Sequence, residues 1–336
     1  MSMRWYVVRR LMWTVFATWL ALTITFGLLT ASPNTGEMQA AFQAAAQGQD
    51  AEAAKKAYRK ARGLDEPVWQ RYVDYIVNMA TLNWGWSTTR SQPVIDAITD
   101  AWPYSAQYII PSTAIAILAG YGIGLYSAMN QYTVTDYIGT FIAFFGISIP
   151  NFWFAIMLIL IGGVWLQDQT LFGISLATIA PPTYYRTDVP LLSIRNLHQI
   201  ILPVIVVSTA SVAGQMRYSR AQALEYVNAE FVKTARAKGA SDWRVLTRHI
   251  LRVALVPLAT ILVADVLAIM FAGAVIAEVI FQIPGIGLLG YKAIIQQDTP
   301  LVLATTLIPV FIAIFGNLLQ DLAYVWLDPR IDYGDR

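Results

Sequence analysis

Six long apolar segments alternate with polar stretches along the chain. A bilayer core about 30 Å thick is spanned by roughly 20 apolar helical residues, and backbone groups in lipid must find hydrogen-bond partners within their own segment. The apolar runs are continuous rather than alternating, which excludes β-strands. We therefore predict an all-α membrane protein with six transmembrane helices, at about residues 5–29, 104–129, 137–166, 198–216, 253–277 and 301–326.

The first segment predicts a retained helix rather than a cleaved signal peptide. Its apolar core, residues 11–29, is longer than the 7–15 residues of a signal-peptide core. No small-x-small cleavage pattern closes it before Ser32. The whole chain, residues 1–336, is thus expected to be a single membrane domain.

Charged residues predict the orientation of this domain. Lysine and arginine concentrate in short cytoplasmic loops. Arg4, Arg9 and Arg10 open the chain, and the segment 217–252 carries eight basic residues against three acidic ones. Both termini and residues 217–252 are therefore expected in the cytoplasm. The first polar loop, residues 32–103, is then extracytoplasmic, since loops longer than about 60 residues escape the charge rule.

Three outer segments carry local signals. The Ala-, Gln- and Lys-rich stretch 37–62 predicts one helix that ends at Gly63. The loop 167–197 contains three prolines and is expected to be ordered but irregular. Residues 281–300 contain Pro and Gly followed by a short, partly polar stretch, and predict a short helix that dips back at the outer face. An ordinary surface loop is the alternative for this last segment.

Composition narrows the function classes. The chain is 57% hydrophobic and 13% charged, whereas ordinary soluble proteins are nearer 45–50% and 25%. Its net charge of +2 indicates neither a nucleic-acid partner nor another polyanion. The absence of cysteine excludes disulfides and thiolate metal sites. His198 and His249 fall on opposite sides of the predicted membrane, so they cannot share a metal ion.

The sequence contains no complete nucleotide-binding pattern. Residues 285–290 match G-x-G-x-x-G, but an apolar helix precedes them where a dinucleotide fold needs a β-strand. Tyr291 stands where a phosphate-binding loop needs lysine. We therefore expect no catalytic site, no metal and no cofactor in this chain, and we do not expect it to be an enzyme.

The segment 217–252 predicts a short helix outside the lipid, at residues 229–238. Asn228 is its expected N-cap, Glu230 lies in the first turn, and Gly239 is the expected left-handed stop, which requires a positive φ. Such a helix can pack into a groove of a partner protein or lie against anionic headgroups. Its helical spacing groups four residues: Phe231, Thr234, Ala235 and Lys238.

The stretch TARAKGASDWRVLTRHILRVALVPL resembles the cytoplasmic loop of ABC-importer permeases, and more narrowly the first permease of the dipeptide, oligopeptide and nickel branch. Lys233 stands where the general importer signature has an acid. The matching signature residues are Thr234, Ala235, Arg236, Gly239 and Pro257. Further similar stretches are GLDEP at 63–67, WGWS at 84–87, GISIPNF at 146–152, PGIG at 284–287, DTP at 298–300 and LDPRI at 327–331.

The resemblance implies one of two permease subunits of a type I ABC importer in a prokaryotic inner or plasma membrane, forming half of the translocation path. The implied partners are a second homologous permease, one or two ATPase subunits that bind ATP and Mg, and an extracytoplasmic substrate-binding protein. Di- or oligopeptides are the implied substrates. Nickel, oligosaccharides and a stand-alone secondary transporter are the alternatives, although we find no internal repeat of the kind common in secondary transporters. In the family a short helix docks on the ATPase, which implies a coupling role for Glu230, Phe231, Thr234, Ala235, Arg236 and Gly239.

Two residues are candidates for the translocation path. Pro150 lies in the GISIPNF stretch. Asp265 lies near the middle of the predicted fifth helix, where an acid is costly and should not face lipid. Asp265 can line the path and meet a positively charged substrate end, pair with the second permease, or be protonated within the bundle.

Overall fold

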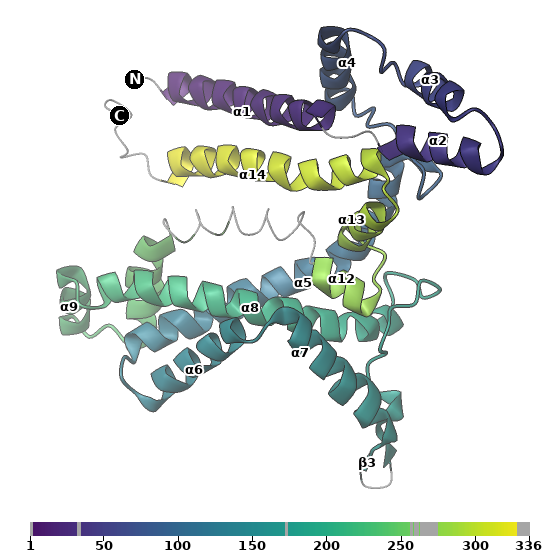
Figure 1. Ribbon diagram of the computed structural model, residues 1–336. Coiled ribbons are helices and arrows are strands. Elements are labelled where there is room, and N and C mark those ends of the chain that lie inside the picture. The colour runs from purple at the N-terminus through teal and green to yellow at the C-terminus, as the bar shows by residue number, and fades with distance from the viewer. Residues whose placement is uncertain are drawn as a thin grey trace.

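The computed structural model describes residues 3–31, 35–171, 174–255, 258, 262 and 275–327. Four long helices dominate it: α1 (Met3–Ala31), α5 (Val94–Met129), α8 (Ile194–Val227) and α14 (Thr299–Leu327). Figure 1 shows α1 and α14 side by side and α8 running the length of the molecule. Within the described residues, five helical stretches are long and apolar enough to cross a membrane, or six if one bent pair is counted as a span. The predicted helical membrane fold is confirmed.

The predicted fifth helix, residues 253–277, lies largely outside the described residues. Residues 251–255 are helical at its beginning. At its end α12 (Val275–Phe281) is followed, after a short turn, by α13 (Ile286–Ile295), and the two helices meet at an angle of 83°. The short helix predicted within residues 281–300 is therefore confirmed as α13.

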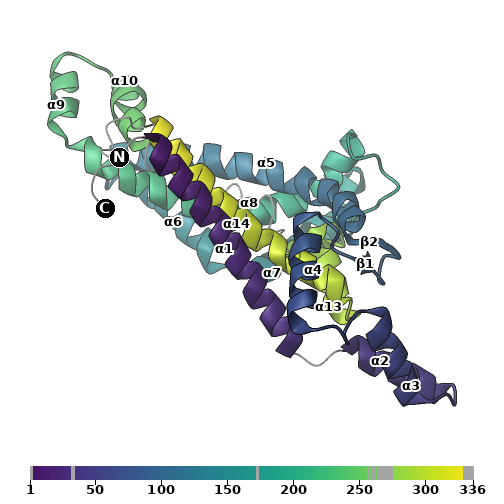
Figure 2. The same cartoon turned by 90° about the horizontal axis from the view of Figure 1, so that it is seen from above.

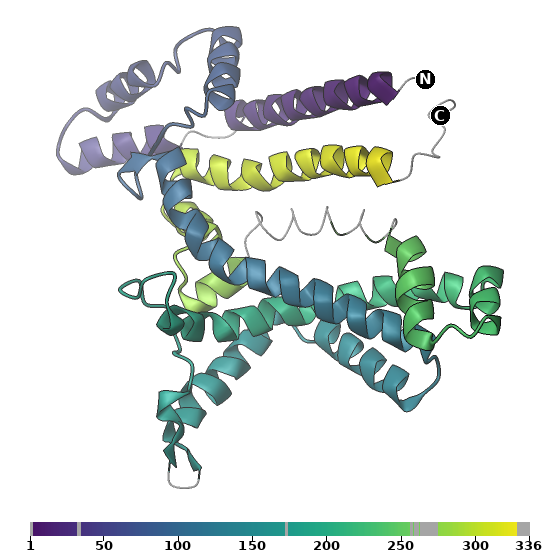
Figure 3. The ribbon, with the colours of Figure 1, turned by 180° about the vertical axis from the view of Figure 1, so that it is seen from behind.

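Helices α5 and α8 form the most extensive helix pair, as Figure 3 shows from behind. Two glycines one turn apart on α5 permit this close approach. A Cβ atom on Gly120 would lie 2.6 Å from Cβ of Gln215, and one on Gly124 would collide with Ser219. These glycines form a G-x-x-x-G pattern, a known sequence signal of tight packing in membranes. The close packing of α5 on α8 was not predicted from it.

The predicted third span, residues 137–166, is not continuous. Helix α6 (Val134–Ser148) ends before Pro150, and α7 (Asn151–Leu158) begins after it. A π-helical turn η1 (Ile159–Val164) and a 3-10 turn η2 (Trp165–Asp168) complete this stretch. Proline lacks the amide hydrogen that a continuous helix needs and clashes with the preceding turn, so the chain bends there and α6 and α7 diverge in Figure 1.

The first polar loop contains three helices and a hairpin. The single helix predicted over residues 37–62 is wrong: α2 (Thr35–Ala46) and α3 (Ala51–Ala61) are separate. Gly48 between them has a φ of +71°, and the Asp50 carboxylate accepts a hydrogen bond from the Glu52 amide at 2.9 Å, which starts a new helix. Helix α4 (Val68–Ala80) follows, and then the antiparallel pair β1 (Trp86–Ser87) and β2 (Gln92–Pro93) (Figure 2).

The second outer loop is irregular, as predicted. It contains a two-residue antiparallel pair, β3 (Thr170–Leu171) with β4 (Ile174–Ser175), followed by the 3-10 turn η3 (Leu176–Thr178). His198 on α8 binds this loop through a contact of 2.9 Å between Nε2 and the carbonyl oxygen of Ile179. This contact gives His198 a structural role, because it holds the loop to α8.

Candidate functional site

The short helix expected after α8 is α9 (Glu230–Ala237), which projects from one end of the molecule in Figure 1. Its N-cap is Ala229, not Asn228 as predicted, because Asn228 is taken up as the C-cap of α8. Gly239 follows α9 with a φ of +80°, as predicted for a left-handed stop. Glycine reaches this conformation without the steric cost that a Cβ atom imposes.

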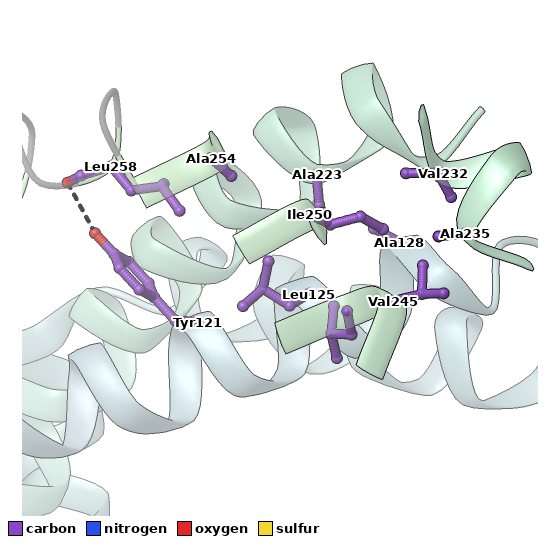
Figure 4. Close-up of a cluster of buried hydrophobic side chains, with 11 residues drawn as sticks. Tyr121, Leu125, Ala128, Ala223, Val232, Ala235, Val245, Ile250, Ala254 and Leu258 are labelled. Carbon is purple, nitrogen blue, oxygen red and sulfur yellow. Dashed lines mark hydrogen bonds between the residues drawn. The ribbon is translucent and has the colours of Figure 1, made fainter. Parts of the chain in front are cut away.

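Helix α9 is anchored by Val232 and Ala235, of which only Ala235 belongs to the group of four that the helical spacing indicated. Val232 and Ala235 are buried, whereas Phe231 is 41% exposed and its ring lies 6.4 Å from that of Tyr226. The anchoring cluster is drawn in Figure 4. The cluster joins α5, α8 and α9 to the chain that follows α10 (Asp242–Arg244), which begins with the π-helical stretch η4 (Val245–Ile250). Its members are Tyr121, Leu125, Ala128, Ala223, Val232, Ala235, Val245, Leu246, Ile250, Ala254 and Leu258.

The surface of α9 outside the buried pair is polar and open. Glu230, Thr234 and Arg236 are exposed, and Gly239 is exposed beyond them. Lys233 Nζ lies 2.7 Å from the Glu230 carboxylate, which leaves the charges on this face partly paired. The exposed ion pairs are worth little to stability. The arrangement is a rigidly anchored helix with a charged outer face, suited to contact another protein.

A buried ion pair joins α5, α6 and α8. Asp136 at the start of α6 is 2% exposed and receives two hydrogen bonds of 3.0 Å from Arg220 on α8. Ser127 on α5 donates to the same carboxylate, as does the backbone amide of Tyr132 at 2.9 Å. Arg220 stands ten residues before α9. This pair was not predicted from the sequence, although a lone acid that opens an apolar helix is a signal for such a partner.

The other end of the molecule holds a second buried carboxylate. Glu278 on α12 is fully buried and accepts hydrogen bonds from Ser105 Oγ at 2.7 Å, Tyr108 OH at 2.9 Å and the Leu288 amide at 2.9 Å. The acid thereby caps the first turn of α13 across the bend. The glycines of the G-x-G-x-x-G pattern have packing roles here, since a Cβ on Gly287 would lie 2.7 Å from Cα of Val275.

A third buried carboxylate ties the hairpin to the start of α14. Asp298 accepts from Ser87 Oγ at 2.7 Å and from the Thr89 amide at 2.9 Å. Burial by itself raises the pKa of Asp298, but these hydrogen bonds outweigh it, so the pKa lies below its usual value of 3.8. The residues that bind Asp298 lie in the WGWS stretch and just beyond it.

The structure describes only one of the two candidate path residues. Pro150 is exposed, precedes α7 as its N-cap and marks the bend between α6 and α7. Asp265 and the signature residue Pro257 lie outside the described residues. Among the residues that the structure describes, no group of three or more His, Cys, Asp or Glu side chains could hold a metal ion.

A bundle of apolar helices with a short projecting helix is the architecture of a multi-pass membrane protein. The family described as "Binding-protein-dependent transport system inner membrane component" matches residues 120–333, and the chain belongs to this family. It is a permease subunit of a type I ABC importer, and it resides in the inner membrane.

Named relatives cover most of the chain. The oligopeptide transport system permease protein AppB of Bacillus subtilis (strain 168) is 35% identical over 272 residues, which are 81% of this chain and 83% of the relative. The dipeptide transport system permease protein DppB of Lactococcus lactis subsp. cremoris (strain MG1363) is 30% identical over 97% of this chain and 98% of its own. The oligopeptide permease OppB of Haemophilus influenzae (strain ATCC 51907 / DSM 11121 / KW20 / Rd) is 31% identical over 80% and 82%.

Proposed function

We propose that this permease imports di- or oligopeptides and forms half of the translocation path with a second, homologous permease. The observation that carries the proposal is the similarity over most of the chain to relatives named for dipeptide or oligopeptide transport. One or two partner ATPases bind ATP and Mg and carry out hydrolysis. An extracytoplasmic binding protein delivers the substrate.

The exposed face of α9 is the proposed contact with the ATPase. Glu230, Thr234 and Arg236 lie on that face, Phe231 is half-exposed beside it, and Gly239 ends the helix. Ala235 holds the helix to the bundle from its buried side. A displacement of α9 then passes through the apolar cluster to α5 and α8, as alternating access requires of a rigid coupling element.

The proposed orientation puts α9 and both termini in the cytoplasm. Figure 1 places the start of α1 and the end of α14 at the same end of the molecule as α9, which agrees with the distribution of basic residues. Gln296, the exposed C-cap of α13, is at the opposite end. A cysteine at Gln296 should react with an impermeant reagent from outside only, and reaction from the cytoplasm alone would overturn the topology.

The test of function is reconstitution of the permease pair with its ATPases and binding protein. ATP hydrolysis and uptake should be stimulated by dipeptides or oligopeptides, and by neither nickel nor oligosaccharides. Stimulation by nickel or an oligosaccharide alone would show that the substrate is not a peptide, while the protein would still be an importer subunit. Active uptake by the isolated subunit, without a copurifying ATPase, would refute the importer itself.

Asp265 supplies a separate test of the path. The variant Asp265→Asn keeps shape and hydrogen bonding but removes the charge. If the carboxylate meets the amino group of a peptide, this variant should transport peptides more slowly while the complex assembles normally. Unchanged transport of every peptide would exclude a charge in the path, and failed assembly would place Asp265 at the interface with the second permease.

A further inference from the structure

Helix α4 in the first outer loop has three distinct faces. Successive helical residues are 100° apart, which places Tyr72 and Tyr75 on one side. Trp69, Val73 and Val77 lie on the next side, and the polar residues follow on the third: Gln70, Arg71, Asp74 and Asn78. A soluble amphipathic helix needs only one apolar face toward its core. The second apolar face of α4 therefore requires an explanation.

The tyrosine face is occupied by α1. The hydroxyls of Tyr72 and Thr23 are 2.7 Å apart, and the ring of Phe26 packs at 5.3 Å from Tyr72 and 5.5 Å from Tyr75. Figures 1 and 2 show α4 crossing α1 near its C-terminal end rather than continuing its direction. Because the short helix α4 runs across the axis of α1 in Figure 1, we infer that it lies roughly along the membrane plane.

The contact with α1 sets the depth of α4. Thr23 and Phe26 precede the end of α1, at Ala31, by about 12 and 8 Å at 1.5 Å per residue. That is about the depth to which the apolar face of an interfacial helix sinks, roughly 5–10 Å. Ile24 and Leu28, next to the contact residues on α1, are exposed apolar side chains of the same membrane-spanning helix.

The second apolar face is open. Trp69 is 69% exposed, Val73 49% and Val77 53%. These side chains lie on a helix whose tyrosine face packs against α1, and α1 qualifies as a membrane span. Tryptophan is favoured at the depth of the headgroups, and the polar face with Arg71 and Asp74 is left for water and headgroups.

We propose that α4 is an interfacial helix that lies in the outer leaflet of the bilayer, with Trp69, Val73 and Val77 immersed in lipid. The occupant of this face is lipid because the adjoining tyrosine face packs on α1 near the end of that membrane-spanning helix, which places the exposed apolar side chains at the depth of the bilayer interface. The helix then anchors the outer loop, including the hairpin bound to Asp298, to the membrane surface. The proposal rests on the membrane topology and not on the identity of the substrate.

The natural absence of cysteine permits a direct test. Single cysteines at Val73 and Val77 are spin-labelled in the assembled transporter, with cysteine-free partner subunits, in lipid nanodiscs. Matched controls at Arg71 and Asp74 sit on the polar face of the same helix. Accessibility to oxygen, which partitions into lipid, is compared with accessibility to a water-soluble nickel chelate.

Labels at 73 and 77 should be several-fold more accessible to oxygen than to the nickel chelate, and labels at 71 and 74 should show the reverse. Equal access to the nickel chelate at all four positions would overturn the proposal in favour of a solvated helix. Low access to both reagents at 73 and 77 would assign the face to the second permease. Loss of access only after the binding protein is added would assign it to that protein. Peptide uptake by the same labelled complexes is measured separately, so the proposed function can fail while the anchor stands.

Discussion

The two ends of the helical bundle each bury a carboxylate, and they satisfy it in opposite ways. At the α9 end, Asp136 is paired with Arg220 and ties together α5, α6 and α8. At the α13 end, the hydrogen bonds to Glu278 come from hydroxyls and a backbone amide, and they fix a single bend. Both acids are almost completely buried.

The difference lies in how each site would respond to being opened. The side chain of Arg220 is 26% exposed, so water can solvate its charge when the pair separates. Two donors to Glu278, Ser105 and Tyr108, come from α5, and the third is the Leu288 amide in the bend, so opening would leave several buried polar groups unsatisfied. We therefore expect the α9 end to rearrange during transport and the α13 bend to remain fixed. Substitutions at matched positions can break this comparison.

The largest effect is expected at Gly287, in the fixed bend. In Gly287→Val the new side chain would meet the backbone of Val275, because a Cβ atom there has only 2.7 Å of space. Overpacking of this kind costs about 3 kcal/mol or more. The variant should yield little assembled complex, measured by copurification of the partner subunits. Normal assembly would show that the bend is not rigid.

A smaller loss is expected for Asp136→Asn. Removing one partner of a fully buried ion pair costs about 3–5 kcal/mol, and the partial exposure of Arg220 lowers this to about 2 kcal/mol. Thermal unfolding of the purified complex measures the effect. The double variant with Arg220→Gln should lose less than the sum of the two single variants, since the pair acts as a unit. Strict additivity would contradict a direct interaction.

Gly239→Val matches the Gly287 variant at the open end. A Cβ atom on Gly239 has no atom within 4 Å, so only the positive φ is penalised, by about 1 kcal/mol or more. The complex should insert and fold normally but lose transport, because the turn after α9 is displaced. Gly239→Asn is the control, since asparagine tolerates this conformation, and it should retain uptake. Transport by Gly239→Val at the normal rate would exclude this turn as the coupling element.

The smallest effect is a pH dependence at Asp298. Its pKa in the folded protein lies below the usual 3.8, so the carboxylate contributes stability that is fully present above that value. This contribution is lost as the pH falls through the lowered folded-state pKa. Release of the hairpin, followed by proteolysis within residues 83–94, should therefore increase only in strong acid. Asp298→Asn should abolish the pH dependence, and an unchanged acid transition in that variant would assign it to another group.

The predictions from the sequence were most often correct where their signal came from residues close together in the chain. The apolar runs and the left-handed conformations of Gly63 and Gly239 depend on few neighbouring residues, and the structure bears them out. The break at Gly48 also has a local signal, the glycine itself. One helix was nevertheless predicted over residues 37–62, because the residues around Gly48 favour a helix. Pro150 likewise gave a signal of the bend in the third span that the continuous apolarity hid.

The sequence by itself determined that lipid surrounds this chain, roughly where the long apolar helices α1, α5, α8 and α14 run, and which short helix projects from them, because burial in a bilayer depends on composition over some twenty consecutive residues. Only the tertiary structure decided which groups meet. Asp136 and Arg220 are 84 residues apart, and Ser105 and Glu278 are 173 apart. It also decided that Val232 rather than Phe231 anchors α9. Such partners depend on how the helices pack against one another, and the periodicity of a single helix does not contain that information.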